Sequence, residues 1–574
     1  MSKNCKHCGS NFTVREEDKV FLENNKIPEP TLCIDCRERR RLAQGNQLYL
    51  YKRKCDLTGK EIISNYHPDS PYKVYNQNIW YSDKWDPLEF GREYDFSKSF
   101  FEQFKELGLA VPRPSLHRGF QYDENSDYTN YAGKNKDCYM IFDSDENREC
   151  YYSYSINSSE SCMDCYRVRG SELCYELIDS EKCYNSAFLQ DCINCSDSYF
   201  LQNCIGCKNC IMCSNLRNKQ YCVNNVQVSK EEYEKQRAKC FSLKDITDGN
   251  KYFNSFKLKF PKKSIHGTQN ENVIGDYISG CKNAYHCFDS AALWDCSYVF
   301  QAFNPLKNCM DIQECGDGEL LYESAFCGYG AYNLKFCSHC LGTCSDMEYC
   351  YHCPHSSNLF GCIGVQHKKY CILNKQYSEQ EYKELIPKII EHMKQDGRAH
   401  GASAQVEQES GSASCSYTEP KNWTYGEFFP AELSPFPYNE TIAQIHYPLE
   451  KDEAIKLGYQ WREKNKEEFK DATYASLNTI QGVKDNVTEE LLKCAVSGRN
   501  YKITKAELAL LRKLNMPLPA ECFFERNNRR NAMRNKRKLY ERKCVKTGEN
   551  ITTTYESENP AIVYCEDCYL SETY

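Results

Sequence analysis

The chain has 574 residues, a formal net charge of −7 and 38 cysteines. It contains no run of about 18 apolar residues, and its opening residues MSKNCKHCGSNFTVREEDK lack the apolar stretch of a signal peptide, so we expect neither a membrane helix nor a secretory leader. We therefore expect a cytoplasmic protein, in which this many thiols serve metal ligation, buried packing or redox chemistry rather than disulfides. The 44 tyrosines favour a mainly β fold.

The N-terminal segment carries two cysteine pairs, CKHC at 5–8 and CIDC at 33–36. Two such pairs can place four thiolates around one zinc ion, and the two-residue spacing within each pair is typical of a zinc knuckle. The sequence therefore predicts a zinc site made by Cys5, Cys8, Cys33 and Cys36.

The run CKHCGSNF, followed by IPEP and CIDCRERRR, resembles the small treble-clef zinc-binding domains of bacteria. Segments such as RKCDLTGKEIIS, WYSDKWDP and GEFFPAELSPFPYNETIAQ resemble a family of large uncharacterised cysteine-rich zinc-ribbon proteins of candidate-phylum bacteria, over nearly the whole chain. That family is sometimes labelled a family III CoA-transferase, but no residues here support that chemistry. The resemblance implies an architecture, with zinc-ribbon modules at the ends.

Two cysteine-dense blocks follow, at 123–228 and 265–377, with 13 cysteines each. In the first block cysteines recur every nine residues, from 165 to 192 and again from 195 to 222, and acidic or amide residues often precede them, as in KDCY and QDCI. Short periods with polar corners predict two tandem β-solenoids of short strands with inward-facing cysteines.

The block cysteines have three interpretations, which the sequence leaves open: a buried ladder of thiols, further zinc sites, or redox thiols. The metal interpretation is strongest where thiols and imidazoles crowd together in CSHC and CYHCPH. Its candidate ligands are Cys337, His339, Cys340, Cys350, His352 and Cys353.

Each block ends in a capping box, Ser229 with Glu232 and Ser378 with Glu381, which predicts a short helix that caps the solenoid. A small-residue polar stretch after the second helix predicts a flexible linker. An aromatic and proline-rich connector follows. The predicted domains are an N-terminal zinc-ribbon module with its connector (1–120), solenoid 1 with its helix (121–245), solenoid 2 with its helix (246–396), the linker (397–420), the aromatic connector (421–485) and a C-terminal zinc-ribbon module (486–574).

The two ends are duplicates, because residues 5–75 match residues 494–564 at a constant offset of 489. The first site is degenerate in the C-terminal copy, where its positions hold Cys494, Ser497, Cys522 and Glu525. A second site survives there as three ligands, Cys544, Cys565 and Cys568, whereas the N-terminal copy has Cys55, Asn76 and Ile79. Its fourth ligand is left open between a carboxylate, a histidine and Cys522.

Both copies carry a basic run after the last knuckle, with net charges of +6 over 37–54 and +8 over 526–543, so the rest of the chain totals −21. Such runs favour a phosphate backbone, RNA or DNA, but can equally be solvated helices or clamps onto the acidic solenoids. The predicted nucleic-acid contacts are Arg37, Arg40, Arg41, Arg53, Lys54, Arg526, Arg529, Arg530, Arg534, Lys536, Arg537, Lys538, Arg542 and Lys543.

No catalytic motif is recognisable in the sequence, so we predict a protein that is not an enzyme, with no small-molecule substrate and no membrane partner. The leading hypothesis is a zinc-binding scaffold for nucleic acid or ribonucleoprotein. The alternatives are a protein-binding scaffold and a thiol-rich metal or redox buffer.

Overall fold

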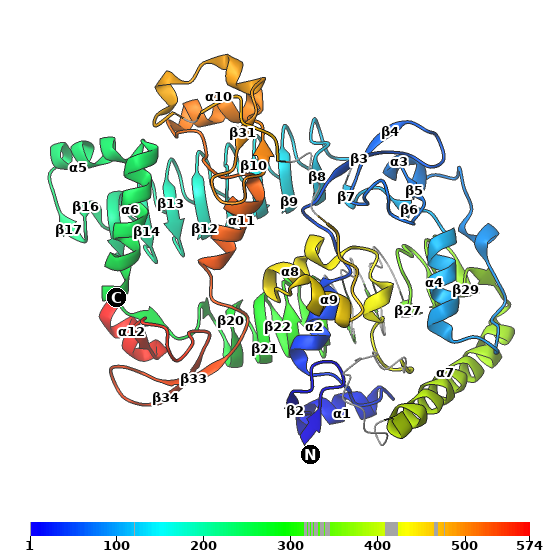
Figure 1. Ribbon diagram of the computed structural model, residues 1–574. Coiled ribbons are helices and arrows are strands. Elements are labelled where there is room, and N and C mark those ends of the chain that lie inside the picture. The colour runs from blue at the N-terminus through cyan, green and yellow to red at the C-terminus, as the bar shows by residue number, and fades with distance from the viewer. Residues whose placement is uncertain are drawn as a thin grey trace. The chain divides into compact units, whose positions relative to one another are not determined.

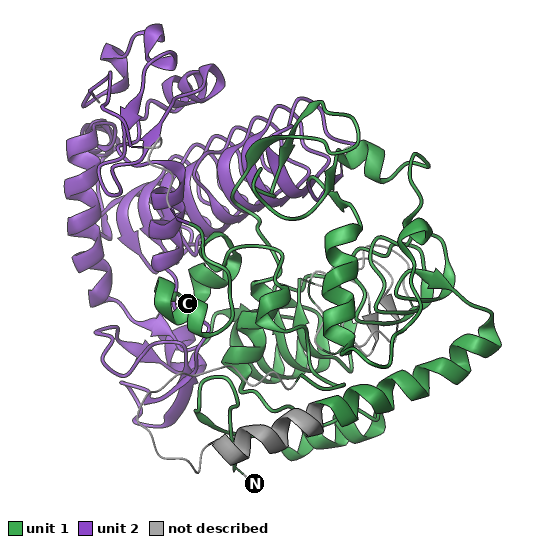
Figure 2. Ribbon diagram, turned by 45° about the vertical axis from the view of Figure 1, so that its right-hand side comes forward, with its two compact units in different colours: residues 1–115, 265–462 green, residues 116–264, 463–574 purple. Residues whose placement is uncertain are grey.

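The computed structural model describes residues 2–119, 121–314, parts of 318–338, 345–407, 423–463, 469–475 and 477–573 (Figure 1). The chain divides into two compact units, each built from two separate stretches of sequence (Figure 2). Unit 1 contains Met1–Ser115 and Ile265–Arg462, and unit 2 contains Leu116–Ser264 and Glu463–Tyr574. The fold is mainly β, as the composition predicts. Each terminal module thus shares a unit with the cysteine block that lies farther from it in sequence.

Unit 2 contains an eleven-stranded sheet, here called ladder 1, in which each strand pairs with the next strand along the chain. Nearly all neighbours are parallel, and the usual register joins a residue to the one 12 positions later, as in Tyr154↔Tyr166. The strands are β7 (Arg118–Gly119), β8 (Thr129–Gly133), β9 (Tyr139–Asp145), β10 (Tyr151–Asn157), β11 (Tyr166–Arg169), β12 (Tyr175–Glu181), β13 (Ala187–Gln190), β14 (Tyr199–Gln202), β15 (Lys208–Ser214), β16 (Gln220–Val223) and β17 (Val226–Gln227).

Ladder 1 is built on a period of three residues. Every third residue from Tyr131 to Asn224 has a positive φ, and only Gly170 and Gly206 among them are glycines. The residue after each positive-φ residue points inward. Every such inward residue from Ala132 to Cys213 is buried. With four inward positions per 12-residue repeat, the interior is narrow and holds only Ala, Ser, Cys, Asn, Val, Ile and Leu.

This period gives the sequence pattern a physical meaning. The acidic residues that precede cysteines, such as Asp137, Glu149, Asp164 and Asp191, occupy the positive-φ positions, where Asp and Asn are enriched among non-glycine residues. The polar corners expected from KDCY and QDCI are therefore present. Because every third residue points inward, cysteines nine residues apart are three inward positions apart. Residues that pair between neighbouring strands are 12 residues apart, which is four inward positions.

Serine and cysteine play the same role inside ladder 1. Ser153 Oγ donates to the Tyr151 carbonyl at 2.9 Å and accepts from the Cys165 N–H at 3.0 Å. Cys174 Sγ donates to the carbonyls of Glu172 at 3.2 Å and Cys183 at 3.6 Å. The inward side chains therefore satisfy backbone groups of the narrow coil while they fill its core.

Unit 1 contains a second sheet of the same kind, ladder 2, in which nearly all paired strands are parallel and most are consecutive along the chain. Its register varies, from 11 residues at Glu271↔Lys282 through 12 at Met347↔Leu359 to 13 at Leu293↔Leu306, which explains its looser cysteine spacing. Its described strands are β19 (Gly267–Thr268), β20 (Glu271–Ser279), β21 (Lys282–Ala291), β22 (Leu293–Phe300), β23 (Leu306–Lys307), β24 (Met310–Gln313), β25 (Gly318–Glu319), β26 (Ala331–Tyr332), β27 (Ser345–Glu348), β28 (Ser357–Phe360), β29 (Lys369–Ile372) and β30 (Lys375–Gln376).

The terminal modules match element by element at the offset of 489 residues. In unit 1 the module contains β1 (Ser2–Asn4), β2 (Asn11–Thr13), α1 (Glu16–Asn24), α2 (Ile34–Leu42), β3 (Tyr51–Lys54), β4 (Glu61–Ser64), β5 (Val74–Tyr75) and α3 (Gln77–Trp80). In unit 2 the counterparts are β31 (Leu492–Lys493), β32 (Asn500–Tyr501), α10 (Lys505–Leu514), α11 (Phe523–Ala532), β33 (Tyr540–Lys543), β34 (Asn550–Thr553), β35 (Val563–Tyr564) and α12 (Glu566–Thr573). The duplication found in the sequence is therefore a duplication of structure.

Helices follow both ladders where the capping boxes predict them. Ser229 caps α5 (Lys230–Arg237), and the Ser378 and Glu381 side chains form the reciprocal bonds of a capping box at the start of α7. α7 (Glu379–Glu407) continues into the predicted linker, the rest of which lies largely outside the described residues. The other elements include short 3-10 helices, labelled η. In unit 1 they are α4 (Phe100–Ala110), β6 (Arg113–Pro114), α8 (Ile442–His446), α9 (Lys451–Lys456), η1 (Pro87–Phe90), η4 (Ala431–Leu433) and η5 (Tyr438–Glu440). In unit 2 they are α6 (Leu243–Phe256), β18 (Lys262–Lys263), η2 (Ala238–Cys240), η3 (Lys257–Lys259), η7 (Ile480–Gly482) and η8 (Asp485–Thr488).

The aromatic connector, which the sequence left without a role, packs against α2 in unit 1. Its Phe428 carbonyl accepts a hydrogen bond from Arg40 at 3.2 Å, and its Tyr447 hydroxyl donates to Glu38 at 2.6 Å. The connector therefore contacts α2, the helix that begins just after Cys33.

Candidate metal centres and basic helices

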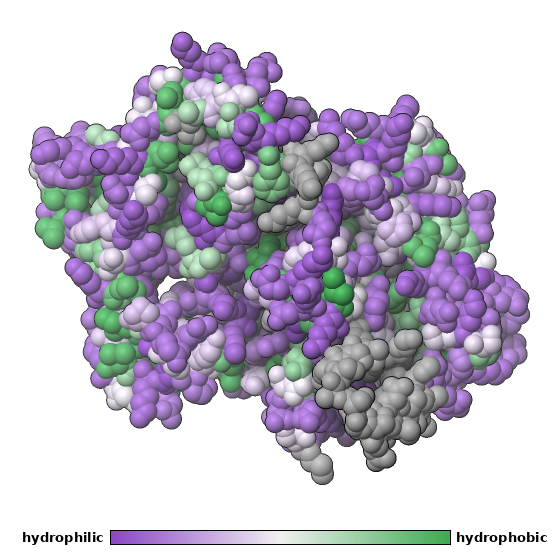
Figure 3. Space-filling view, in the orientation of Figure 1, coloured by the Kyte–Doolittle hydropathy of each residue, from purple (hydrophilic) through white to green (hydrophobic). Residues whose placement is uncertain are grey.

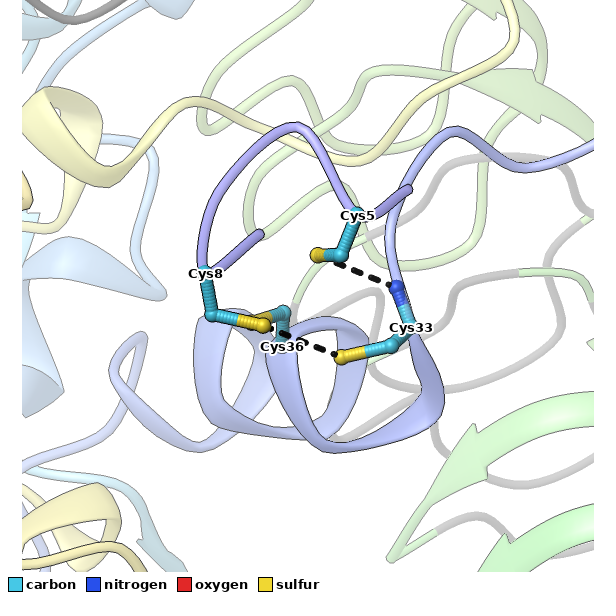
Figure 4. A group of neighbouring side chains, drawn as sticks. All are labelled: Cys5, Cys8, Cys33 and Cys36. Atoms are coloured by element: carbon cyan, nitrogen blue, oxygen red, sulfur yellow. Dashed lines mark hydrogen bonds between the residues drawn. The ribbon is translucent and has the colours of Figure 1, made fainter. Parts of the chain in front are cut away.

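The structure brings together the four cysteines of the predicted N-terminal site (Figure 4). Cys5 and Cys8 lie on the turn between β1 and β2, while Cys33 and Cys36 lie at the start of α2. Their Sγ atoms are all within 4.8 Å of one another, and those of Cys8 and Cys33 are 3.7 Å apart. Metal–sulfur bonds of about 2.3 Å in a tetrahedron separate sulfurs by about 3.8 Å. The four thiols fit a tetrahedral metal ion.

Backbone hydrogen bonds hold the first cysteine in place. The Gly9 N–H donates to the Cys5 carbonyl at 2.9 Å, and a φ of +74° at Gly9 makes this tight turn accessible. The Cys33 N–H donates to Cys5 Sγ at 3.3 Å. Thiol donors, first Cys33 and then Cys36, lower the pKa of Cys5 well below its ordinary value, and the thiol contacts with Cys33 and Cys5 raise the pKa of Cys36.

The same turn occurs four times in the described part of the two terminal modules. Cys55, Cys494 and Cys544 each accept, at the carbonyl, a hydrogen bond from a positive-φ glycine four residues later, at 2.8, 3.0 and 2.8 Å. Asn76 and Cys565 donate their N–H groups to Cys55 and Cys544 at 3.3 Å, as Cys33 does to Cys5. Each terminal module therefore contains two copies of one knuckle, of which only the first copy in the chain keeps four cysteines.

The knuckle of Cys544 retains three thiols. The Sγ atoms of Cys544, Cys565 and Cys568 lie within 4.8 Å of one another and could hold a metal ion. Burial raises the pKa of Cys544, but hydrogen bonds from the Thr547 hydroxyl and the Cys565 N–H outweigh it, and the pKa is lowered to about 6. The nearby Glu549 carboxylate, followed by burial, raises the pKa of Cys565 to about 12. Thr547 occupies the place that Cys8 has in the first knuckle, and Glu549 supplies an oxygen donor beside the thiols.

The remaining knuckles lack a ligand set among the described residues. Ser497 Oγ lies 3.9 Å from Cys522 Sγ, and neither Cys494 nor Cys55 belongs to a described group of three ligand atoms. In the predicted site of solenoid 2, Cys337, His339 and Cys340 lie outside the described residues. Cys350, His352 and Cys353 form no such group within the described part of the chain, and the Cys350 and Cys353 thiols donate to backbone carbonyls.

The other ladder cysteines that the structure describes are buried, and the thiols of ladder 1 donate to carbonyl oxygens. Burial raises the pKa of Cys150, Cys165, Cys174 and Cys192 well above the ordinary value of a thiol. A thiol that donates a hydrogen bond keeps its proton, whereas a metal ligand must lose it. These contacts agree with the buried thiol ladder.

The basic helix α2 faces ladder 2 with its arginines. Arg37 Nε lies 3.0 Å from Asp311 Oδ2, and Arg41 Nη1 donates to Asp311 Oδ1 at 3.1 Å. All three side chains are buried. Arg37 also stacks over Tyr298, whose hydroxyl donates to Asp18 of α1 at 2.6 Å. Two arginines, two acids and one tyrosine thus join the N-terminal module to ladder 2.

The basic helix α11 makes the same contacts with ladder 1. Arg526 and Arg530 both pair with buried Asp164, the latter at 2.9 Å, and Arg526 stacks over Tyr152. The Tyr152 hydroxyl donates to Glu507 of α10 at 2.8 Å. Arg526, Arg530 and Glu507 correspond to Arg37, Arg41 and Asp18 at the offset of 489 residues. We call each set of contacts the arginine latch of its unit.

The predicted nucleic-acid contacts differ in their exposure and in their partners within the fold. Seven of the predicted side chains are buried: Arg37, Arg40, Arg41, Arg53, Arg526, Arg530 and Arg537. Arg529 pairs with Glu176 at 2.6 Å, Arg534 with Asp179 at 2.7 Å, and Arg542 donates to three backbone carbonyls. Lys54, Lys536, Lys538 and Lys543 are exposed. In the structure the latch arginines contact carboxylates of the ladders, and the predicted phosphate contacts stay a prediction.

Sequence reasoning missed the acidic half of each latch, Asp311 and Asp164. A signal was present: the duplicated modules keep both arginines and the acid of the preceding helix, while the rest of the chain carries the compensating negative charge. Positive φ at both aspartates also marks them as corner residues of the ladders.

No family model matches the chain, and no curated protein matches it. Among solved structures, a crystal structure described as that of an acetyltransferase from Desulfovibrio desulfuricans G20 is similar at 10% sequence identity and a TM-score of 0.10. The similarity covers 46% of this chain and 69% of that one. So distant a likeness carries no conclusion about fold or activity. Within the described ranges, no helix combines the length and the apolar character needed to span a membrane.

Proposed function

We propose that this protein is a non-catalytic, zinc-stabilised scaffold that binds other proteins. In this proposal the ladders are the expected β-solenoids, and the terminal modules are zinc-ribbon domains that hold zinc at Cys5, Cys8, Cys33 and Cys36 and at the knuckle of Cys544. The arginine latch carries the proposal, because the same buried contacts recur in both units.

The latch favours a protein scaffold over a nucleic-acid binder. A phosphate backbone attracts arginines whose charge is free, and each phosphate contact adds to the salt dependence of binding. Here Asp311 and Asp164 neutralise paired arginines inside the fold. The face shown in Figure 3 is mostly hydrophilic, with scattered apolar areas. The latch arginines are buried.

The ladder interiors favour a scaffold over a thiol buffer. A buffer needs thiols that exchange metal, whereas the thiols of ladder 1 are buried and donate to carbonyl oxygens. We therefore assign tight structural metal to the two knuckles and packing to the ladder cysteines.

Metal content and nucleic-acid binding test this function together. Protein purified without added zinc should carry two tight equivalents, one for each ligand group. Many labile equivalents would support the buffer instead. The native chain should not bind single-stranded RNA, structured RNA or duplex DNA at either of two salt concentrations. Binding that weakens steeply with salt would overturn the protein scaffold and restore nucleic acid as the partner.

A further inference from the structure

Unit 2 contains a groove where α10 meets the first strands of ladder 1. It encloses a cavity of about 620 Å³, within the range of roughly 300–1,000 Å³ that is typical of ligand sites. Its walls are Asn125, Asp127, Tyr128, Asp137, Cys138, Tyr139, Glu149, Tyr151, Thr504, Ala506, Ala509, Leu510 and Lys513. Three tyrosines and three carboxylates face a single lysine across this groove.

The charges of the groove favour a cation. Asp137 accepts from Asn125 at 2.8 Å and Glu149 accepts from Ser161 at 3.0 Å, so both receive neutral donors. Lys513 donates to the same Ser161 hydroxyl at 3.1 Å. Asp127 pairs with Arg118 at the rim. Tyrosine faces beside carboxylates are the surroundings in which cationic groups bind by stacking and by charge.

Unit 1 shows what fills the corresponding place. Tyr285 lies 13 residues before the latch tyrosine Tyr298, as Tyr139 lies 13 residues before Tyr152, so Tyr285 is the counterpart of Tyr139. The guanidinium carbon of Arg15 lies 3.6 Å from the centre of the Tyr285 ring. The guanidinium of Arg15 therefore occupies this position in unit 1.

The chain supplies no arginine at the equivalent place in unit 2. Residue 504, the counterpart of Arg15 at the offset of 489, is a threonine. Arg15 Nη2 donates to the latch acid Asp18 at 2.8 Å and to Ser297 Oγ at 3.0 Å. In unit 2 the latch acid is Glu507, which is 1% exposed. Its Oε1 lies 3.9 Å from Arg526 Nη2, although it accepts no hydrogen bond from the described residues. The difference between the units at this helix start is therefore the residue over the tyrosine ring, an arginine in unit 1 and a threonine in unit 2.

We propose that the groove of unit 2 binds an arginine side chain of a partner protein, which stacks on Tyr139 beside the carboxylates of Asp137 and Glu149. This rests on the proposed protein scaffold and names its binding chemistry. A planar guanidinium stacks on a ring and donates in the plane, which a lysine ammonium cannot reproduce. The acidic walls exclude phosphate groups.

The test uses the full chain and a short acetylated and amidated peptide with one arginine, labelled with fluorine and titrated by ¹⁹F NMR to millimolar concentrations. We expect binding that weakens about tenfold when the arginine is replaced by lysine, and more for citrulline, which keeps the shape without the charge. Arginine amide is titrated in parallel as a free small molecule. If it binds with the same affinity as the peptide, the site recognises the arginine side chain without the rest of the peptide.

Thr504→Arg supplies the missing guanidinium from the chain itself and should abolish peptide binding. Arg15 stands at the same helix start without a side-chain cap, whereas the Thr504 hydroxyl caps α10, so the variant also removes this cap and its folding must be checked. Circular dichroism and metal content should match the unmodified chain. Tyr139→Leu is the second variant and should weaken binding about tenfold. Tyr122→Leu, at an exposed tyrosine outside the groove, is the control and should change nothing.

Equal binding by the unmodified chain and by both groove variants would overturn the assignment, as would the absence of binding at millimolar peptide. Either result leaves the scaffold intact if two metal equivalents are present and nucleic acid does not bind. Conversely, nucleic-acid binding would overturn the scaffold whether or not the arginine peptide occupies the groove.

Discussion

Arg530 donates a hydrogen bond to Asp164 at 2.9 Å across 366 residues of sequence, and neither side chain is exposed to solvent. Its counterpart in the other unit joins Arg41 to Asp311 at 3.1 Å, also fully buried. A buried charge whose partner is removed stays desolvated without compensation, so each aspartate should be essential to its unit.

Asp311→Asn should lower the stability of unit 1 by roughly 3–5 kcal/mol, the usual cost of breaking a buried ion pair on one side. The measurement is the urea midpoint followed by tryptophan fluorescence. All tryptophans belong to unit 1: Trp80, Trp85, Trp294, Trp423 and Trp461.

Asp164→Asn is the matched variant in unit 2. It should leave the tryptophan transition in place and shift the transition seen by circular dichroism. If the two variants shift the tryptophan midpoint equally, the latches do not act within separate units.

Cys5→Ser and Cys33→Ser should each release one zinc ion and shift tryptophan emission, since structural zinc contributes roughly 10–16 kcal/mol of apparent folding free energy in small modules. The metal is counted with a chromogenic chelator after denaturation. Cys565→Ser should release the other equivalent without changing tryptophan emission. Cys494→Ser should release none, and a loss there equal to that of Cys5→Ser would show that the degenerate knuckle binds metal.

The metal ligands could be predicted because their signal is local. Cys5 and Cys8 lie on one turn and Cys33 and Cys36 on one helix start, so their spacing alone implies their geometry. The offset of 489 residues likewise predicts both modules and the three-thiol knuckle. The polar corners before cysteine were also predictable, because each is a local pattern of two or three residues.

The latches could not be predicted from spacing, because Arg526 meets Asp164 only through the topology that pairs each module with the distant ladder. The three-residue period was hidden for another reason. Cysteine fills only some inward positions, and Ser171 or Leu177 fill others equally well, so the cysteine steps of nine obscured a repeat of 12.

The ladder thiols should resist alkylation in the native protein. Cys174, Cys183 and Cys204 are buried and donate to backbone carbonyls, so mass spectrometry after a short iodoacetamide pulse should find them unmodified until urea unfolds unit 2. Exposed Cys8 should react once a chelator has removed metal. Rapid native modification of the three ladder thiols would contradict a packed interior, and metal release during slow modification would indicate ligation.

Unit 1 should lose stability in mild acid through His286. Burial, and after it the positive charges of Arg37 and Arg15, lower the pKa of His286 from 6.5 to about 4. The negative charge of Asp311 acts in the opposite direction and offsets part of the shift. The folded state therefore holds this histidine neutral. Below about pH 6.5 the unfolded chain takes up the proton first, so stability is present above that pH and is lost as pH falls towards about 4, by up to roughly 3 kcal/mol.

The variant His286→Gln isolates this contribution, because other groups of unit 1 titrate in the same range and remain in both proteins. The tryptophan-reported urea midpoint should fall between about pH 7.5 and about pH 4.5 in the unmodified chain, and the variant should fall less. At the higher pH the substitution removes the ring contacts of His286 with Phe288 and Tyr298, so the variant starts from a lower midpoint. Parallel pH dependence in the two proteins would show that His286 is not the group that couples protonation to the folding of unit 1.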